Sequence, residues 1–173
     1  GHPALHTGAP MRRLDTTDWR ILKELMADGS LTNVALAGKV GLSAPPCLRR
    51  VRALEEAGVI TGYTALVDER TLGFELTAFA MVGLHNQQEA DLRAFENRVL
   101  AWPLVRECYM LSGETDFLLK CIAPDLTAFQ DFVIDELTAA PNVASVKTTL
   151  VIRRVKFEPG VPGDRLEVAV GGQ

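Results

Sequence analysis

The sequence predicts an α+β chain with two unlike parts: a short helical part, followed by a sheet that is covered by helices. Between Leu14 and Gly58, apolar residues recur at helical spacing and are interrupted by capping residues. From Phe74 onward, apolar strands alternate with helical segments in the order β-α-β, and this order occurs twice. A chain of 173 residues is long enough for two such small domains.

The composition is that of a globular protein with a real core, because 47% of the residues are hydrophobic and 23% are charged. No apolar run approaches the ~18 residues that a membrane helix needs. No charged-then-apolar leader precedes the fold, so we expect a cytoplasmic protein without a membrane partner. The three cysteines are widely spaced and form no C-x-x-C pair. We therefore expect buried free thiols, with no metal site, disulfide framework or cofactor.

The net charge of −4 is unevenly distributed along the chain. Residues 11–70 hold nine Lys/Arg against eight Asp/Glu, a net of +1, whereas residues 71–173 hold nine against fourteen, a net of −5. The acidic balance belongs to the second part, so it does not exclude a nucleic-acid partner for the first.

Residues 32–58 have the pattern of a helix, a tight turn and a second helix. Thr32 is placed to cap the first helix, and Gly41 stands where a helix ends in a left-handed residue. Ser43 is the expected cap of the second helix, with a hydroxyl that accepts from an unpaired amide. Pro45 and Pro46 fall in its first turn, where a missing N–H costs little.

The second helix has an apolar back and a basic front. Arg49 points most nearly away from the apolar stripe, with Arg50 and Arg52 on its flanks. Such a face suits the major groove of double-stranded DNA, where arginine holds phosphates or guanine edges. A solvated cationic face on an ordinary helical hairpin is the alternative. The inward stripe consists of Cys47, Leu48, Val51 and Leu54. The candidate DNA contacts are Thr32, Asn33, Ser43, Ala44, Pro45, Pro46, Arg49, Arg50 and Arg52.

A further helix precedes this pair and a β-rich stretch follows it. The first helix opens near Asp15, with Asp18 in its first turn, and stops at Asp28-Gly29. Residues 59–67 are β-rich and predict the strand or hairpin of a wing. Residues 11–68 are therefore expected to form a winged helix-turn-helix DNA-binding domain, and residues 1–10 a disordered leader outside the fold.

The second part predicts a ferredoxin-like βαββαβ sandwich of four antiparallel strands with both helices on one face. It is expected to span residues 69–157, and residues 158–173 form an extension of unexplained role. The expected strands are 76–84, 105–111, 117–122 and 143–155, and the expected helices are 89–101 and 125–139. Strands 76–84 and 118–122 offer apolar side chains on both faces. We therefore expect a homodimer in which a second copy covers the other sheet face.

The chain resembles the Lrp/AsnC family of transcriptional regulators from about Leu14 to Lys156. The family's first part is matched by the segments LDTTDWRIL (14–22), DG (28–29), LAGKVGLS (36–43), PCLRRVR (46–52), LE (54–55) and GVITGY (58–63). Its second part is matched by SGETDFLL (112–119). The resemblance implies a regulator of pseudo-palindromic DNA sites, dimers that assemble into octamers, and an amino-acid effector bound between dimers.

By this resemblance, Asp116 holds the amino group of the effector and amides around Gly113 meet its carboxylate. A glycine turn of exposed N–H groups makes an anion nest, and a carboxylate suits an ammonium. The alternative is that the segment is only a good hairpin turn. Phe117 departs from the family by lacking an aromatic hydroxyl, and Ser30 by replacing a basic residue. The implied effector residues are Ser112, Gly113, Glu114, Thr115 and Asp116, with Thr148, Thr149 and Leu150 of the last strand as further walls.

Three functions fit these residues. The leading one is a sequence-specific, DNA-binding transcriptional regulator that responds to an amino-acid-type effector. A sequence-tolerant architectural DNA-binding protein would use the same arginines, and a small-molecule sensor without effector-dependent regulation would use only the second part. We do not expect an enzyme, because the candidate carboxylates and Cys108 lack an obvious histidine partner and no catalytic motif is present.

Overall fold

The computed structural model describes residues 13–163, which divide into two compact units. Residues 13–66 together with 157–163 form the helical unit, and residues 67–156 form the sheet unit. The sequence predicts the divisions after residues 68 and 157. The predicted leader, residues 1–10, lies outside the described part of the chain.

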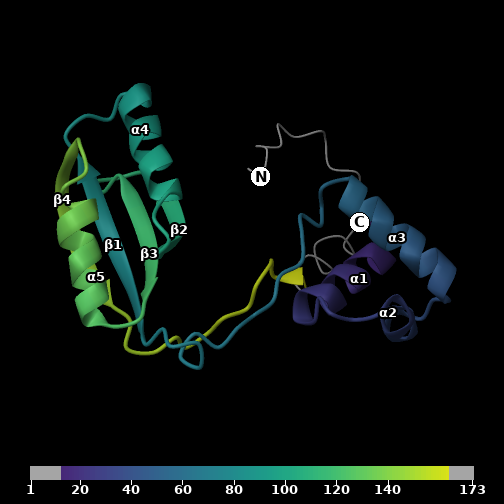
Figure 1. Cartoon of the computed structure of the whole chain (residues 1–173). Helices are drawn as coiled ribbons and strands as arrows, with labels where there is room; N and C mark the ends of the chain where they lie inside the picture. The colour runs from purple at the N-terminus through teal and green to yellow at the C-terminus, as the bar shows by residue number, and fades with distance from the viewer. Residues whose placement is uncertain (1–12, 164–173) are drawn as a thin grey trace. The chain divides into compact units, whose positions relative to one another are not determined.

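The helical unit contains three helices around one apolar core (Figure 1). Ile21, Leu36, Cys47 and Leu54 are almost completely buried, and each helix contributes at least one of them. Local sequence explains the turn between the second and third helices, since Gly41 adopts the left-handed φ of 74° that ends the second helix. The helices are α1 (Thr16–Ala27), α2 (Asn33–Val40) and α3 (Ala44–Glu56).

Two of the three expected helix caps form as side-chain hydrogen bonds. Oγ1 of Thr32 accepts from the N–H of Ala35 at 3.1 Å, as predicted. Asp15 and Asp18 make a reciprocal capping box at the start of α1. The predicted hydroxyl bond of Ser43 is wrong, since its side chain makes no capping bond. A cap accepts from the second or third helical residue, and in α3 both are prolines, which have no N–H.

The predicted wing strand over residues 59–67 is also wrong, because this segment forms no strand in the described chain. A strand needs a neighbour to bond its backbone groups. The amides of Val59 and Ile60 instead donate to the carbonyl of Leu54, at 3.0 and 3.2 Å, and so close the end of α3. Further along, the ring of Tyr63 lies against Gly29, on the loop after α1.

The return segment, residues 157–163, belongs to the helical unit although it follows the sheet unit in sequence. The amide of Val161 donates to Sδ of Met26 in α1 at 3.5 Å. Gly160 has a φ of 95°, and a Cβ at that position would overlap the thioether of Met26. The beginning of the predicted extension therefore packs on α1, and residues 164–173 lie outside the described part.

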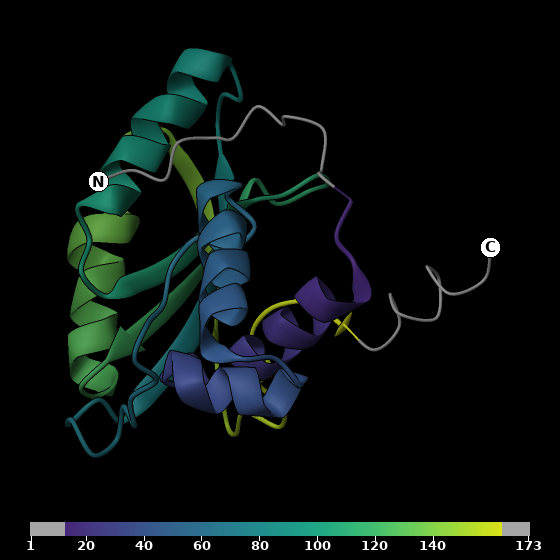
Figure 2. The same ribbon diagram turned by 90° about the vertical axis from the view of Figure 1, so that its right-hand side faces the viewer.

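The sheet unit has the predicted ferredoxin-like arrangement, a four-stranded antiparallel sheet in the order β2-β3-β1-β4. Its helices lie on one face of the sheet, where Figures 1 and 2 show them in teal and green. The central pairing sets Leu76 opposite Ala123 and Val82 opposite Phe117. The elements are β1 (Leu76–Leu84), α4 (Glu89–Leu100), β2 (Val105–Met110), β3 (Phe117–Ala123), α5 (Leu126–Phe132), the π-helical turn η1 (Val133–Leu137) and β4 (Val143–Leu150).

Two predicted elements end earlier than the sequence suggests. The helix expected to reach residue 139 is α-helical only to Phe132 and continues as η1, where the hydroxyl of Thr138 donates to the carbonyls of Val133 and Ile134. The strand expected to reach residue 155 ends at Leu150, which pairs with Ala78. Only Thr77 and Leu76 of β1 lie beyond this pair, so β1 is too short to pair with a strand that reaches residue 155. Beyond that point, one last bond joins the N–H of Val151 to the carbonyl of Thr77.

The two faces of the sheet differ in burial. On the helix-covered face, every second residue of β1 and β3 is buried, beside a cluster of four aromatic rings: Phe95, Trp102, Phe117 and Phe132. On the other face, Phe79, Met81, Leu118 and Ile122 are only half-buried. In residues 13–163, no helix is long and apolar enough to cross a membrane.

Candidate nucleic-acid interface and effector hairpin

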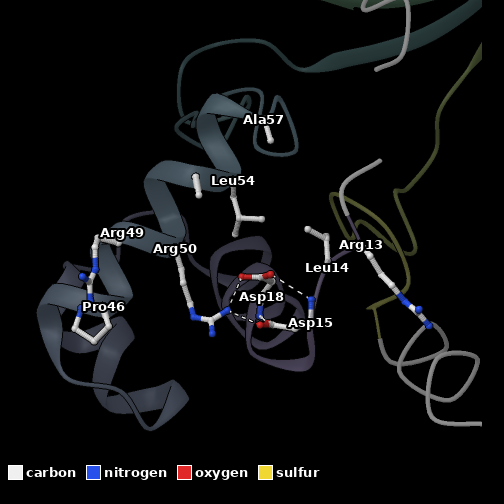
Figure 3. Close-up of a pocket in the computed structure, with 10 residues that line it drawn as sticks. Arg13, Leu14, Asp15, Asp18, Pro46, Arg49, Arg50, Leu54 and Ala57 are labelled. Atoms are coloured by element: carbon white, nitrogen blue, oxygen red, sulfur yellow. Dashed lines mark hydrogen bonds and ion pairs between the residues drawn. The ribbon is translucent and has the colours of Figure 1, made fainter. Parts of the chain in front are cut away.

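A groove runs along α3 beside the start of α1 and encloses about 480 Å³ (Figure 3). Asp15 and Asp18 line it from α1, and Arg49 and Arg50 line it from α3. The remaining lining residues are Arg13, Leu14, Pro46, Ala53, Leu54 and Ala57. The groove brings together the basic front of α3 and the acidic N-terminus of α1.

The solvent side of α3 presents cations between small residues. Arg49 and Arg52 are exposed, and Pro45 and Ala53 lie on the same exposed side. The buried side holds Cys47 and Leu54, as the apolar stripe predicts. An exposed face with two arginines and few bulky side chains can approach a polyanion closely.

Arg50 does not share this outward position. Its Nη1 donates to Oδ2 of Asp15 at 2.7 Å and to Oδ1 of Asp18 at 3.1 Å. Figure 3 shows its guanidinium reaching across to both carboxylates, while Arg49 projects in another direction. The amide of Asp18 and then Arg50 hold the pKa of Asp15 below its usual value, and the two carboxylates raise the pKa of Arg50.

Asn33 is likewise engaged inside the helical unit. Its Nδ2 donates to the carbonyl of Ala44 at 2.8 Å and so ties the start of α2 to the start of α3. Its Oδ1 is buried and has no hydrogen-bond partner. The hydroxyl oxygen of Thr32 already accepts the capping bond of α2.

The effector hairpin joins β2 to β3, and Asp116 is fixed by β1. The amide of Leu84 donates to Oδ2 of Asp116 at 2.6 Å, and the amide of Asp116 donates to the carbonyl of Val82 at 3.0 Å. Nε2 of Gln87 donates to the carbonyl of Leu84 at 2.7 Å and lies 3.5 Å from Oδ2 of Asp116. This carboxylate therefore organises the end of β1, next to the irregular pairing of Gly83 and Leu84.

The tip of the hairpin is open. Ser112, Gly113 and Glu114 are exposed, and Thr115 is half-buried. Gly113 has a φ of 126°, and a Cβ there would meet no atom within 4 Å. The backbone at Gly113 is thus accessible, as an anion-binding turn requires.

The two groups of predicted effector residues are not adjacent in one chain. Leu150 lies opposite Ala78, whereas Asp116 bonds Leu84, six residues further along β1. At about 3.3 Å per residue, this separation is roughly 20 Å. Thr148 and Leu150 also face the helix side of the sheet, while Thr149 between them faces the open side. A single chain therefore does not assemble all eight residues into one pocket.

The cysteines are free thiols in apolar surroundings. Cys47 and Cys121 are buried and Cys108 is half-buried. Burial raises the pKa of Cys108 to about 11 and that of Cys121 to about 12, so both are protonated at neutral pH. Among the described residues, no group of His, Cys, Asp and Glu is arranged to hold a metal ion.

The sequence does not indicate the partners of two site residues, Arg50 and Asp116. The local pattern identifies Asp15 and Asp18 as helix-start residues and not as ligands of Arg50, and it does not single out Gln87 beside Asp116. The spacing of the two aspartates indicates that they share the start of α1. Their contact with Arg50 depends on how α1 crosses α3, which a local pattern does not contain.

Comparison with known proteins places both units in one family. The Lrp/AsnC ligand-binding domain matches residues 77–161, and a winged helix-turn-helix DNA-binding family matches residues 14–61. The leucine-responsive regulatory protein of Rhizobium meliloti is 62% identical over 143 residues, which cover 83% of this chain and 92% of that protein. The transcriptional regulator AzlB of Bacillus subtilis is 39% identical, over 88% of this chain and 98% of the relative.

Solved structures agree with this match. A transcriptional regulator of Neisseria meningitidis, crystallised with L-methionine, superposes with a TM-score of 0.85 at 38% identity, over 89% of this chain and 99% of that one. An AsnC family regulator of Agrobacterium tumefaciens gives a TM-score of 0.82 at 32% identity, over 88% and 99% of the two chains. The chain therefore belongs to the Lrp/AsnC family of transcriptional regulators.

Proposed function

We propose that the chain is a sequence-specific DNA-binding regulator whose helical unit reads double-stranded DNA through α3. The observation that carries this proposal is the outward position of Arg49 and Arg52 on the small-residue face of a helix buried on its other side. Arginine can hold guanine edges and phosphates in the major groove. A pseudo-palindromic site follows if the chain binds as a symmetric dimer. Its place of action is then the cytoplasm, and it needs neither catalysis nor a cofactor.

The sheet unit is proposed to bind an amino acid at the hairpin around Gly113. The accessible left-handed turn offers backbone amides to a carboxylate, and Oδ1 of Asp116 is the candidate for an ammonium. The methionine complex of the Neisseria meningitidis relative supports an amino acid as the class of ligand. Thr149, which pairs with Phe79 five residues from Leu84 along β1, would complete the pocket as a residue of another copy.

The assembly is proposed to be a homodimer formed through the open sheet face, with higher assembly to an octamer. Phe79, Met81, Leu118 and Ile122 give this face a half-buried apolar centre, which a second copy would cover. Their removal from water would add stability at about 25 cal/mol per Å² of apolar surface. Sedimentation of the purified chain over a range of concentrations distinguishes dimer from octamer.

A thermal-shift screen against the twenty amino acids tests the effector proposal. A ligand present at one hundred times its dissociation constant adds about 2.7 kcal/mol to the stability of the state it binds. One or a few amino acids should raise the melting temperature. Gly113→Val, which places a branched side chain on the accessible turn, should abolish the rise. If none of the twenty produces a shift, the amino-acid effector is wrong for this chain.

A further inference from the structure

We infer that Arg50 is a positioning residue that locks α3 onto α1, and that it does not contact DNA. The inference deepens the proposed function and rests on it, because it divides the basic front of α3 into residues that touch DNA and one that orients them. The sequence places Arg50 and Arg52 alike on the flanks of the basic front, but in the structure Arg50 makes ion pairs with Asp15 and Asp18 at the start of α1.

The geometry of Arg50 is that of a clasp between two helices. One nitrogen, Nη1, donates to the carboxylates of both Asp15 and Asp18, at 2.7 and 3.1 Å. The side chains of Arg50 and Asp18 are 36% and 18% exposed, so this pair is partly shielded from water, whereas the side chain of Asp15 is 53% exposed. A cation that pairs with two carboxylates contributes more to stability than a single exposed ion pair does.

The two carboxylates are themselves fixed. Oδ1 of Asp15 accepts from the amide of Asp18 at 2.8 Å, and Oδ2 of Asp18 accepts from the amide of Asp15 at 3.2 Å. Each aspartate therefore uses one oxygen to cap α1 and the other to hold Arg50. The same two side chains therefore cap α1 and hold α3 in its orientation.

Charge balance gives the clasp a second consequence. The carboxylates of Asp15 and Asp18 more than neutralise Arg50, so its charge is not offered to phosphates beside the groove. Recruiting Arg50 to DNA would leave two neighbouring carboxylates without their cation, which is unfavourable. Arg49 and Arg52 have no such acidic partner among the described ion pairs.

The experiment measures binding of the full chain to two duplexes as a function of salt, for wild type, Arg49→Ala and Arg50→Ala. One duplex is selected by the wild type from a random pool, and the other is a scrambled duplex of the same length. The slope of log K against log[salt] reports the number of phosphates that the protein neutralises, at about 0.9 for each. Arg49→Ala should flatten the slope by about 0.9 for each phosphate that the variant no longer binds. Arg50→Ala should leave the slope unchanged.

A positioning role also predicts a weaker discrimination between the duplexes. With α3 free to tilt, Arg50→Ala should reduce the ratio of affinities for the selected and scrambled duplexes by roughly tenfold, the equivalent of one weakened base contact. Arg50→Lys, which can still reach one carboxylate, should recover part of that ratio. A residue that merely adds stability would leave the ratio unchanged below the melting temperature.

A double-mutant cycle with Asp15→Asn tests the clasp without DNA. Asparagine keeps the helix cap but removes the charge, and Arg50→Ala in that background should accelerate amide exchange of α1 and α3 less than it does in wild type. The inference is overturned if the two substitutions act independently, if Arg50→Ala flattens the salt slope as Arg49→Ala does, or if discrimination is unchanged. Failure of the wild type to bind either duplex would instead refute the proposed function, and the cycle would still decide the clasp.

Discussion

The backbone N–H of Leu84 donates a 2.6 Å hydrogen bond to Oδ2 of Asp116, across the 32 residues that separate the end of β1 from the start of β3. The family resemblance assigns this carboxylate to the effector. The structure gives it a task in the fold as well, because it satisfies an amide at the irregular end of β1. Both tasks can coexist, since each uses a different oxygen.

We therefore predict that Asp116→Ala destabilises the sheet unit by about 1–3 kcal/mol, the cost of leaving a part-buried amide without its charged acceptor. Asp116→Asn keeps an acceptor oxygen and should cost less than about 1 kcal/mol. Urea unfolding of both variants measures the difference. Equal losses would contradict a role for the bond to Leu84.

This result also decides how an effector experiment is designed. Loss of an amino-acid response in Asp116→Ala would combine a damaged fold with a damaged site. Asp116→Asn separates the two, because it preserves the bond to Leu84 while removing the charge that an ammonium needs.

Gly160 and Gly163 provide a matched pair on the return segment. Gly160→Ala places a Cβ against Sδ and Cγ of Met26 at a φ of 95°, so we predict a loss of roughly 1–3 kcal/mol in the helical unit. Gly163→Ala meets Cε of Met26 at 3.6 Å, an ordinary contact, and should change stability by less than about 0.5 kcal/mol. Thermal unfolding of the two variants, monitored by a signal from α1, compares their stabilities. Equal effects would mean that the return segment does not pack on Met26 in solution.

The two helix caps of the turn provide another pair. Thr32→Ala removes the bond to the amide of Ala35 and should cost about 0.5–2 kcal/mol. Ser43→Ala should be nearly neutral, because the prolines at positions 45 and 46 offer no N–H to its hydroxyl. In a Pro46→Ala background an amide returns, and Ser43→Ala should then become destabilising. Chemical unfolding of the four variants checks the order.

The sequence is most informative where structure is determined locally. The left-handed Gly41 and the cap of Thr32 follow from conformational preference and side-chain position, and the structure has both as predicted. The missing cap of Ser43 also has a local cause that the sequence contains. Its hydroxyl cannot accept a bond because the two prolines that follow have no N–H.

The remaining differences concern partners that lie far away in the chain. A β-rich composition at residues 59–67 indicates a strand, but pairing requires a neighbour that the described chain does not supply. The helical wheel places Arg50 on the flank of α3, and the position of α1 turns that flank inward. The separation of Leu150 from Asp116 follows from the strand register, which sequence motifs do not reveal.

The pH dependence of stability tests the charge on Asp15. Its folded pKa is lowered, first by the amide of Asp18 and next by Arg50, so its contribution is present above the ordinary value of 3.8 and is lost as the pH falls through the lower folded value. The stability difference between wild type and Asp15→Asn should be constant near neutral pH and shrink below pH 3.8. A difference that persists unchanged into acid would show that the carboxylate contributes through shape and not through charge.

The exposed face of α3 is proposed to read DNA. The most direct measurement selects duplexes from a random pool with the wild type, Arg49→Ala and Arg52→Ala. The affinity of each protein for the sequence that the wild type enriches is then measured. Wild type should enrich a pseudo-palindromic site, and each variant should bind that site at least about tenfold more weakly, the loss of one or more base or phosphate contacts at about 1.4 kcal/mol or more. Binding that enriches no sequence would contradict the account and indicate an architectural protein, and variants with wild-type affinity would remove α3 from the interface.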